Sequence, residues 1–556
     1  TKKADLIAMR IQIAVLTSSL VLNSGYAVAQ LPSALQPSLS SETWTSPDFY
    51  QVHAIGYDEK TFATPESLKK DVDFTYRKLK KFQPALYWYI YKEQLDYKFD
   101  SLKTTITKPL TSYEFYTKLT PVINEIKQGH LGVFPNTIKR SKQEIETLVK
   151  KGIGPFSQFN FTIDNDRLFV EKNNSIESSI ANGSEVISID SVPTSELLQK
   201  YKQLIVSDGY NKTFIKHQLL RRFPELYTNE YGVKDSLLYE FKHLNATRKV
   251  WIKRKRIGIE NAIKTDSIVK KLSKSEKKEL LAKHKKENLI KSLRGYDAST
   301  KTFNRTLSYA EKDSSIAILD IKSFSIGDYK TFYKQSFKEI KDKNAQYLII
   351  DLRNNLGGRL DEINYLYSFI ADSSISFIDK SIVATKTSLL KRDYFDKNWG
   401  VNIVKGIAYP LYASYTLFRV KKSEKTYFYK TSQNKPSPLD ANHFKGKIYV
   451  LINGASFSAS SIISSNLKGS KRAIFVGEET GGAYNGTVAG QMPFIKLPNS
   501  KIRVRLGLMK IAPHYKTEEI GRGIHPDVEI IPTLEDKITK NDPEKNWIYQ
   551  HIKKSK

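Results

Sequence analysis

The sequence predicts an α/β protein in which a strand-and-helix domain follows a small helical domain and a β-rich module. Strand-like apolar runs alternate with helical patterns from about residue 303 to 535, which is typical of an α/β domain. Apolar residues recur at three- and four-residue steps between about residues 66 and 126, which predicts helices. Residues 156 to about 205 instead contain alternating stretches such as FNFTI, which indicate strands. A chain of 556 residues is also too long for one ordinary domain.

The first 29 residues have the three regions of a secretory signal. Lys2, Lys3 and Arg10 precede an apolar stretch from Ile11 to Leu22, and Ala27-Val28-Ala29 then stands before Gln30. The apolar stretch is too short to span a bilayer as a helix, which needs about 20 residues. We therefore expect cleavage after Ala29, a periplasmic or secreted protein, and no stable membrane insertion of the mature chain.

Composition narrows the possible chemistry. The chain has no cysteine, which excludes disulfides, thiol catalysis and zinc sites built from thiolates. Its formal net charge of +31 could indicate nucleic-acid binding, but an exported chain seldom meets nucleic acid, so no nucleic-acid partner is predicted. The densest basic stretch, Lys253 to Arg294, has leucines at helix-like intervals and is predicted to be a solvated helical insertion. Contact of this stretch with anionic lipid or acidic protein is the alternative.

Six segments are expected after the leader. Proline-rich residues without periodicity predict a linker, and changes in pattern mark the later boundaries. The segments are a linker (30–65), an N-terminal helical domain (66–150), a β-rich module (151–245), the basic helical insertion (246–302), the α/β domain (303–535) and a C-terminal tail (536–556).

The β-rich module contains a pattern known from peptide-binding domains. Strand-like runs are followed by GSEVISID at residues 183–190, then by Pro193 and a helix-like SELLQKYKQL. This order resembles a PDZ-type module, in which such a segment precedes the helix beside a peptide groove. Generic packing of a small β-rich domain is the alternative.

Two segments of the α/β domain supply the chemistry. YLIIDLRNNLGG at 347–358 and KIYVLINGASFSASSIISSNLKG at 447–469 are apolar runs that end in polar, small-residue turns and then begin a helical pattern. The first turn supplies glycines and the second supplies serines. A serine hydroxyl at a strand-to-helix turn, next to unhindered backbone N–H groups, has the parts needed for acyl transfer.

Four ordered motifs then carry a family resemblance. DLRNNLGG (351–358), NGASFSASSII (453–463), VGEETGG (476–482) and GRGIHPDVEI (521–530) resemble the successive motifs of the tail-specific, or C-terminal processing, serine peptidases. The order of domains is similar to the branch that includes the tricorn protease core. The likeness extends from about residue 66 to 535, and it implies a crotonase-like catalytic domain and a polypeptide substrate.

The resemblance also implies roles for individual residues. The family nucleophile is the middle serine of a Ser-x-Ser-x-Ser run, which is Ser458 here, between Ser456 and Ser460. For any one of these serines a helix cap is the alternative role, and Ser456 fits it. Oxyanion stabilisation is expected from backbone N–H groups of Gly357 or Gly358 and of Ala459, because a tetrahedral intermediate needs two convergent donors.

The general base differs from that of the processing-peptidase branch. That branch has a lysine 25 positions after the nucleophile, where this chain has Ala483. The tricorn-like branch uses a histidine from the helical domain, held by a glutamate late in the catalytic domain. His130 fits the histidine, and Glu518 or Glu519 fits the glutamate, with His514 as the rival base.

Two functions remain open from the sequence. The tricorn core has a serine before its histidine, and Gly129 in that position here leaves a direct or water-mediated relay. The first function is a secreted or periplasmic serine endopeptidase that cleaves unfolded polypeptides through an acyl-enzyme on Ser458. The second is a catalytically inactive protein that binds peptide or another ligand on the same scaffold. No HExxH, Walker or EF-hand pattern occurs, so no cofactor is predicted, and the sequence does not define the oligomeric state.

Overall fold

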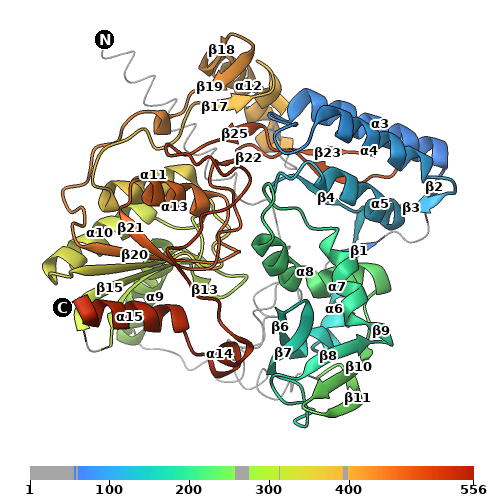
Figure 1. Ribbon diagram of the computed structural model, residues 1–556, viewed down its shortest axis with the longest axis horizontal. Helices are drawn as coiled ribbons and strands as arrows, with labels where there is room; N and C mark the ends of the chain where they lie inside the picture. The colour runs from blue at the N-terminus through green and yellow to red at the C-terminus, as the bar shows by residue number, and fades with distance from the viewer. Residues whose placement is uncertain (1–54, 58–60, 257–273, 312, 392–398, 556) are drawn as a thin grey trace.

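The computed structural model describes residues 55–57, 61–256, 274–311, 313–391 and 399–555 (Figure 1). The predicted leader at 1–29 and most of the predicted linker at 30–65 lie outside these ranges. Within them, mixed helices and strands form the α/β arrangement that the sequence predicts, and none of their helices is long and apolar enough to cross a membrane.

The central sheet has the strand order β14-β15-β16-β20-β21-β26. Strands β15 to β26 are parallel, and β14 is antiparallel at one edge. Strands β16 and β20 coincide with the starts of the two predicted apolar runs, because a parallel strand that is buried on both faces reads as a continuous apolar run. The bounds are β14 (Arg305–Ala310), β15 (Asp313–Ile321), β16 (Tyr347–Asp351), β20 (Lys447–Ile452), β21 (Ala473–Gly477) and β26 (Val528–Glu529).

Helices cover both faces of this sheet (Figure 1). Alternate residues of β16 enter different cores: Leu348 and Ile350 join the main core, whereas Ile349 packs with Ile548 and Ile552 of the last helix. This alternation is the period of two of a strand. The helices on the main-core face are α10 (Tyr329–Asp342), α11 (Leu360–Ile370) and α13 (Ala459–Gly469), and the helix on the other face is α15 (Pro543–Ser555).

The prediction of a C-terminal tail at 536–556 is therefore wrong. Helices α14 (Leu534–Thr539) and α15 occupy most of this segment. Ile548 and Ile552 lie four residues apart on one face of α15, and both are buried against the central sheet. The C-terminal residues are thus part of the α/β domain.

A second sheet, with strand order β18-β19-β17-β25-β22, lies beside the central one. The long helix α12 (Trp399–Arg419) leads directly into its edge strand β18, and the short helix η5 (Ser388–Lys391) packs against α12. The sequence analysis did not predict α12 or this sheet. The strands are β17 (Ser381–Val383), β18 (Val420–Ser423), β19 (Thr426–Tyr429), β22 (Thr487–Ala489) and β25 (Met509–Ile511).

Helices make up most of the N-terminal region. The first helix begins with Thr64 as its N-cap, whose side chain accepts a hydrogen bond from the Ser67 amide, and with Pro65 in the first turn. The helices are α3 (Pro65–Phe82), α4 (Lys92–Thr104), α5 (Ser112–Asn124) and α6 (Lys142–Lys150), with short strands β1 (Ile55–Tyr57), β2 (Phe62–Ala63), β3 (Leu110–Thr111) and β5 (Thr137–Lys139) between them.

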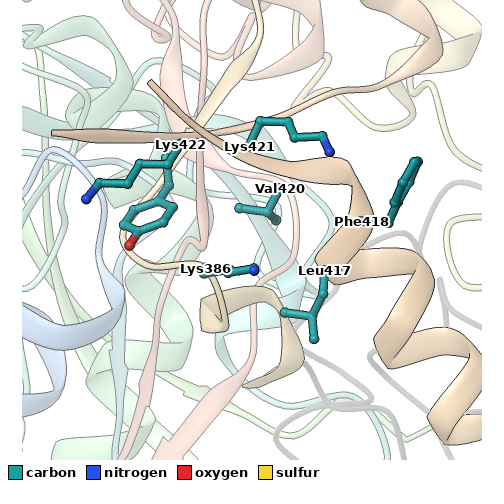
Figure 2. Close-up of a pocket in the computed structure, with 7 residues that line it drawn as sticks. Lys386, Leu417, Phe418, Val420, Lys421 and Lys422 are labelled. Carbon is teal, nitrogen blue, oxygen red and sulfur yellow. The ribbon is translucent and has the colours of Figure 1, made fainter. Parts of the chain in front are cut away.

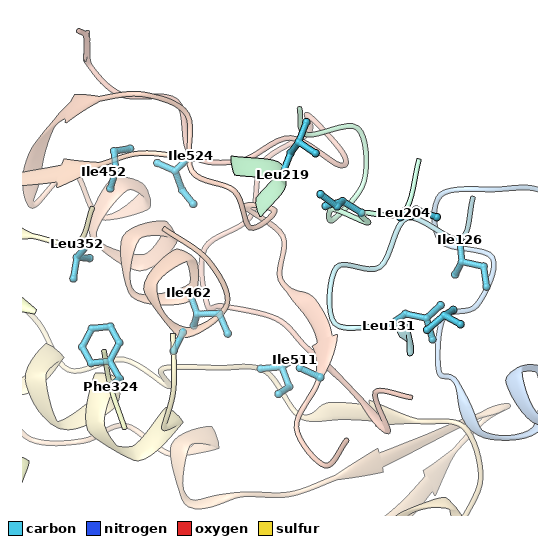
Figure 3. Packing of buried hydrophobic residues seen from close by; sticks show 14 of the residues in the cluster. Ile126, Leu131, Leu204, Leu219, Phe324, Leu352, Ile452, Ile462, Ile511 and Ile524 are labelled. Atoms are coloured by element: carbon cyan, nitrogen blue, oxygen red, sulfur yellow. The ribbon is translucent and has the colours of Figure 1, made fainter. Parts of the chain in front are cut away.

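The N-terminal region is joined to the α/β domain. Strand β4 (Gly132–Phe134) pairs with β24 (Arg503–Arg505), which in turn pairs with β23 (Phe494–Lys496). One hydrophobic core extends across this junction, from Ile126 and Leu131 to Ile452 and Ile462 (Figure 3). This junction holds the loop after α5 close to the turn before α13.

The middle region is an antiparallel sheet with the strand order β11-β10-β8-β7-β6, on which α7 packs. Strand β10 pairs along its whole length with β11, from Ser236 opposite Lys253 to His243 opposite Ala246. The predicted boundary between residues 245 and 246 is therefore wrong, because it divides a hairpin. The elements are β6 (Phe159–Asp164), β7 (Arg167–Asn173), β8 (Glu185–Ile189), β9 (Val192–Pro193), α7 (Thr194–Lys202), α8 (Thr213–Tyr231), β10 (Ser236–His243) and β11 (Ala246–Lys253).

The described part of the predicted basic insertion contains the helix α9 (Lys274–Arg294), followed by β12 (Tyr296–Asp297) and β13 (Thr302–Phe303). Leu281 and Leu289 of α9 are 69% and 66% exposed. The helix therefore presents both leucine and lysine side chains to solvent.

Candidate active site

The two motif-bearing turns meet at one edge of the central sheet. Strands β16 and β20 are parallel neighbours with Asp351 beside Leu451, so the turns that follow them emerge together. Ser456 Oγ donates to the carbonyl of Leu352 at 2.8 Å, and Ser460 Oγ donates to the carbonyl of Asn355 at 2.9 Å. Both serines are fully buried. The outer serines of the Ser-x-Ser-x-Ser run therefore fasten one turn to the other, and Ser456 is not a helix cap.

The middle serine has an unusual backbone. Ser458 precedes the first residue of α13 and has φ 58° and ψ −117°. Residues other than glycine adopt this backbone conformation at a cost of about 1–3 kcal/mol. Such a strained strand-to-helix turn is how a nucleophile elbow presents its hydroxyl. Gly357 packs directly against it, since a Cβ on Gly357 would lie 2.7 Å from Ser458 Cβ.

His130 is the histidine that reaches Ser458. Its Nε2 lies 2.9 Å from Ser458 Oγ, and its ring stacks on Phe457 with centroids 4.7 Å apart. Arg505 Nε donates to the His130 carbonyl at 2.8 Å, which fixes the backbone of this turn. Burial, and then the positive charge of Arg505, lower the pKa of His130 from 6.5 to about 3. The imidazole is therefore neutral at neutral pH, the form that a general base needs.

A hydroxyl and a carboxylate lie behind the imidazole. His130 Nδ1 is 3.0 Å from Thr487 Oγ1, and Thr487 Oγ1 donates to Asp208 Oδ1 at 3.2 Å. With the Thr487 hydroxyl proton directed to Asp208, its oxygen can accept only from an Nδ1–H. The arrangement therefore favours the tautomer that leaves Nε2 free to accept the proton of Ser458.

Asp208 is held in the loop between α7 and α8. It is 1% exposed, and its Oδ1 also accepts a hydrogen bond from the Gly129 amide at 2.7 Å. Burial raises the pKa of Asp208 from 3.8 to about 6, against the opposing effect of these hydrogen bonds. Gly129 has no room for a side chain, since a Cβ there would lie 2.7 Å from Phe457 Cζ. The relay serine of the tricorn-like pattern is thus replaced by Thr487, which comes from β22.

The prediction that Glu518 or Glu519 orients His130 is wrong. Both glutamates are exposed, and Glu519 Oε2 lies 3.4 Å from His525 Nε2 instead. The rival base His514 is also exposed, and its ring packs edge-on against Tyr515. These residues lie on a surface loop, whereas the acceptor at His130 Nδ1 is the buried Thr487 hydroxyl.

The two later motifs support each other. Arg522 forms a two-pronged ion pair with Glu479, at 3.0 and 2.7 Å, and the Gly523 amide donates to the same carboxylate at 2.7 Å. GRGIHPD therefore holds VGEETGG in place and does not supply the catalytic carboxylate. Ala483, which replaces the lysine of the processing branch, is 2% exposed, and Lys468 Nζ pairs with Asp527.

The predicted oxyanion donors lie around Ser458. Ala459 begins α13, so its N–H is among those that a helix leaves without an internal acceptor. The Gly357 amide already donates to Asn355 Oδ1 at 2.8 Å. Of the two glycines in this turn, Gly358 is therefore the one whose N–H can serve as an oxyanion donor. In the described part of the chain, histidines, aspartates and glutamates form no cluster suited to a metal ion.

Comparison with known proteins gives a consistent result. Residues 315–530 match the sequence model of peptidase family S41. None of the curated proteins matches the chain. The crystal structure of mature CPAF has a TM-score of 0.53 and 15% identity, over 86% of this chain and 94% of that one. Mature CPAF complexed with lactacystin gives a TM-score of 0.52 and 16% identity, over 86% and 96%. At these identities the likeness establishes the fold.

The matched residues contain Ser458 and Thr487, and the strained turn at Ser458 agrees with the role of that serine in the motif. By this match, residues 315–530 form a domain of peptidase family S41, and the chain is a serine peptidase of the tail-specific, C-terminal processing type.

Proposed function

We propose that the protein is a secreted or periplasmic endopeptidase that cleaves unfolded polypeptides through an acyl-enzyme on Ser458. The observation that supports this most strongly is the 2.9 Å contact between His130 Nε2 and Ser458 Oγ at a strained nucleophile turn. Its location is supported by the leader pattern of residues 1–29. A mature protein that starts at Gln30 in N-terminal sequencing would agree with this location, and an uncleaved leader would contradict it.

In the first step, His130 Nε2 accepts the Ser458 proton as Oγ attacks the substrate carbonyl. The imidazolium that forms donates through Nδ1 to Thr487 Oγ1, whose hydroxyl donates to Asp208. The amides of Ala459 and Gly358 are the donors we assign to the oxyanion. His130 then returns the proton to the leaving amine, and water hydrolyses the acyl-enzyme by the same route.

The middle region supplies the proposed contact for the rest of the polypeptide. Helix α7 packs on β7 and β8, in the segment that resembles a PDZ-type module. We assign to it the binding of an extended peptide, which gains main-chain hydrogen bonds by adding to a sheet. Unfolded chains meet this requirement because their backbone groups are free.

A fluorophosphonate probe tests the proposed function. Such probes react with a serine that an adjacent base activates, so we expect one adduct, located at Ser458 by peptide mass spectrometry. The labelled protein should no longer hydrolyse a denatured protein substrate. An unlabelled Ser458, together with no hydrolysis of denatured substrates, would favour the inactive ligand-binding protein instead.

The pH dependence of turnover should depend on Asp208. Its pKa of about 6 means that the carboxyl is neutral at low pH, and only the anion stabilises the imidazolium through Thr487. We expect kcat/KM to rise with pH through about 6, whereas His130, with a pKa near 3, is neutral over the whole range. Asp208→Asn should remove this rise and lower turnover, by less than the ~10⁴-fold lost when a directly bonded triad aspartate is replaced.

The control is the double variant Glu518→Gln/Glu519→Gln, which should keep the parent pH profile because both side chains are exposed. A rise through pH 6 that survives Asp208→Asn would remove Asp208 from the relay.

The pH dependence of the free energy of unfolding gives an independent measure. A buried carboxyl whose pKa is raised on folding destabilises the folded state increasingly as pH rises from about 4 to 6, by roughly 3 kcal/mol for two units. Asp208→Asn should remove this dependence.

A further inference from the structure

Helix α12 presents an apolar stripe to solvent. Five large side chains, spaced three or four residues apart, share one face of the helix and are each more than half exposed. They are Ile403 (54%), Ile407 (77%), Leu411 (71%), Tyr415 (51%) and Phe418 (74%). The stripe is about 22 Å long at 1.5 Å per residue. Monomeric soluble proteins rarely leave a continuous apolar surface of this kind without a partner.

Cationic side chains gather at the C-terminal end of the stripe. Arg419 lies over the Tyr415 ring at 5.0 Å and Lys421 over the Phe418 ring at 4.6 Å. Lys421 and Lys422 of β18 are exposed. The segment from Trp399 to Ser423 contains no acidic residue, and Glu424 in the following turn is the first one.

A pocket of about 400 Å³ lies at this end of the helix (Figure 2). Its apolar lining comes from Leu417, Phe418 and Val420, and Lys386, Lys421 and Lys422 supply three ammonium groups. A lining that combines apolar side chains with several cations suits a ligand that has an acyl chain and an anionic headgroup. Figure 1 shows α12, β18 and β19 together at one end of the molecule.

We propose that α12 is an interfacial helix that binds the surface of an anionic phospholipid bilayer. An amphipathic helix with aromatic and aliphatic residues on one face and Lys or Arg beside them lies in the membrane interface. The cations distinguish this partner from a second copy, because self-association would bring like charges together in a chain of net charge +31. This is peripheral binding, in which the helix lies in the plane of the membrane surface.

Vesicle flotation of the full chain tests the proposal. Vesicles of phosphatidylglycerol and phosphatidylcholine in equal parts should bind the protein, and pure phosphatidylcholine vesicles should not. Ile407→Ser/Leu411→Ser should weaken binding at least tenfold. Leu281→Ser/Leu289→Ser, at similarly exposed positions of α9, should leave it within twofold.

Two charge-reversal variants distinguish binding at α12 and β18 from general electrostatic attraction of the basic chain to anionic vesicles. Lys421→Glu/Lys422→Glu should weaken binding at least tenfold, whereas Lys553→Glu/Lys554→Glu, the same charge change at exposed positions of α15, should not. Because the chain has no cysteine, Leu411→Cys carries a single bimane label, whose emission should shift to the blue on vesicle binding, unlike that of Lys554→Cys.

Three outcomes would overturn the proposal. One is a parent chain that does not bind the anionic vesicles. Another is a loss of binding in the α9 or Lys553/Lys554 controls as large as in the α12 variants. The third is a parent dimer that Ile407→Ser/Leu411→Ser dissociates in analytical ultracentrifugation, which would assign the stripe to self-association. Unchanged peptide turnover in each variant shows that it is folded.

Discussion

Ser458→Ala is expected to lower the rate of peptide turnover by roughly a millionfold, the scale at which a catalytic serine hydrolase loses its nucleophile. The Oγ of Ser458 is the hydroxyl that lies 2.9 Å from the base. The measurement is cleavage of a denatured protein, followed alongside the thermal midpoint. Ser458→Ala removes only the hydroxyl and keeps the strained backbone, so the thermal midpoint should change little. Turnover equal to that of the parent would remove Ser458 from catalysis.

Ser456 provides the matched control, two residues away in the same motif. Its buried hydroxyl donates to the Leu352 carbonyl and accepts from the Asn453 amide at 3.1 Å, so Ser456→Ala removes the acceptor of that amide and should cost about 1–3 kcal/mol of stability. Turnover at a temperature where this variant is folded should remain within about tenfold of the parent, because the lost hydrogen bond positions the turn but touches no reacting atom. Ser458→Gly should be inactive yet melt higher than Ser458→Ala, since glycine adopts φ 58° freely.

His130→Ala is expected to be nearly as damaging, with a loss of at least a thousandfold and on the scale of the serine variant. Without Nε2 no group accepts the Ser458 proton, so fluorophosphonate labelling of Ser458 should also be lost. The double variant Ser458→Ala/His130→Ala should be no slower than Ser458→Ala alone, because the two residues act as a unit.

The control for a lysine base is Lys468→Met/Lys471→Met. Lys468 Nζ pairs with Asp527, so removal of both ammonium groups should leave turnover near that of the parent. A His130→Ala enzyme with near-parent turnover would end the Ser-His assignment, and a large loss in the lysine double variant would point to the dyad of the processing branch.

Much of the catalytic domain could be predicted because its signals are local. The apolar runs of β16 and β20 are buried on both faces, so their sequence pattern and their structure coincide. Ser458 and His130 could be proposed from the sequence because each lies in a motif whose neighbouring residues must also fit the local turn. Ser456, Ser460 and Gly357 explain that constraint, since each fits the turn around the nucleophile.

Asp208 and Thr487 could not be predicted because nothing local marks them. An aspartate before a glycine in a loop is common in turns, and a threonine next to a valine is common in strands. Their importance comes from a contact between residues 279 apart in sequence. The exposed Glu518 and Glu519 were chosen because the resemblance places a carboxylate late in the chain, whereas here the carboxylate precedes the nucleophile.

The sequence pattern did not predict helices α12 and α15, for other reasons. Gly406 and Pro410 lie within α12, and both residue types weaken a helical signal. Its exposed face is apolar, so the usual contrast between a buried and a solvated face is lost. In α15 the signal was only the pair Ile548 and Ile552 in a short polar segment, and its burial depends on the sheet that it covers.

The separation of the catalytic residues along the chain sets the time at which activity can begin. His130 and Ser458 are 328 residues apart, and His130 and Thr487 are 357 apart. Because a ribosome makes the N-terminal residues first, the proposed base and its carboxylate wait on an unfinished chain until β20, α13 and β22 have been synthesised and packed. A nascent or truncated chain has no assembled site and cannot digest itself or its neighbours. The fold thus delays proteolysis until synthesis is almost complete.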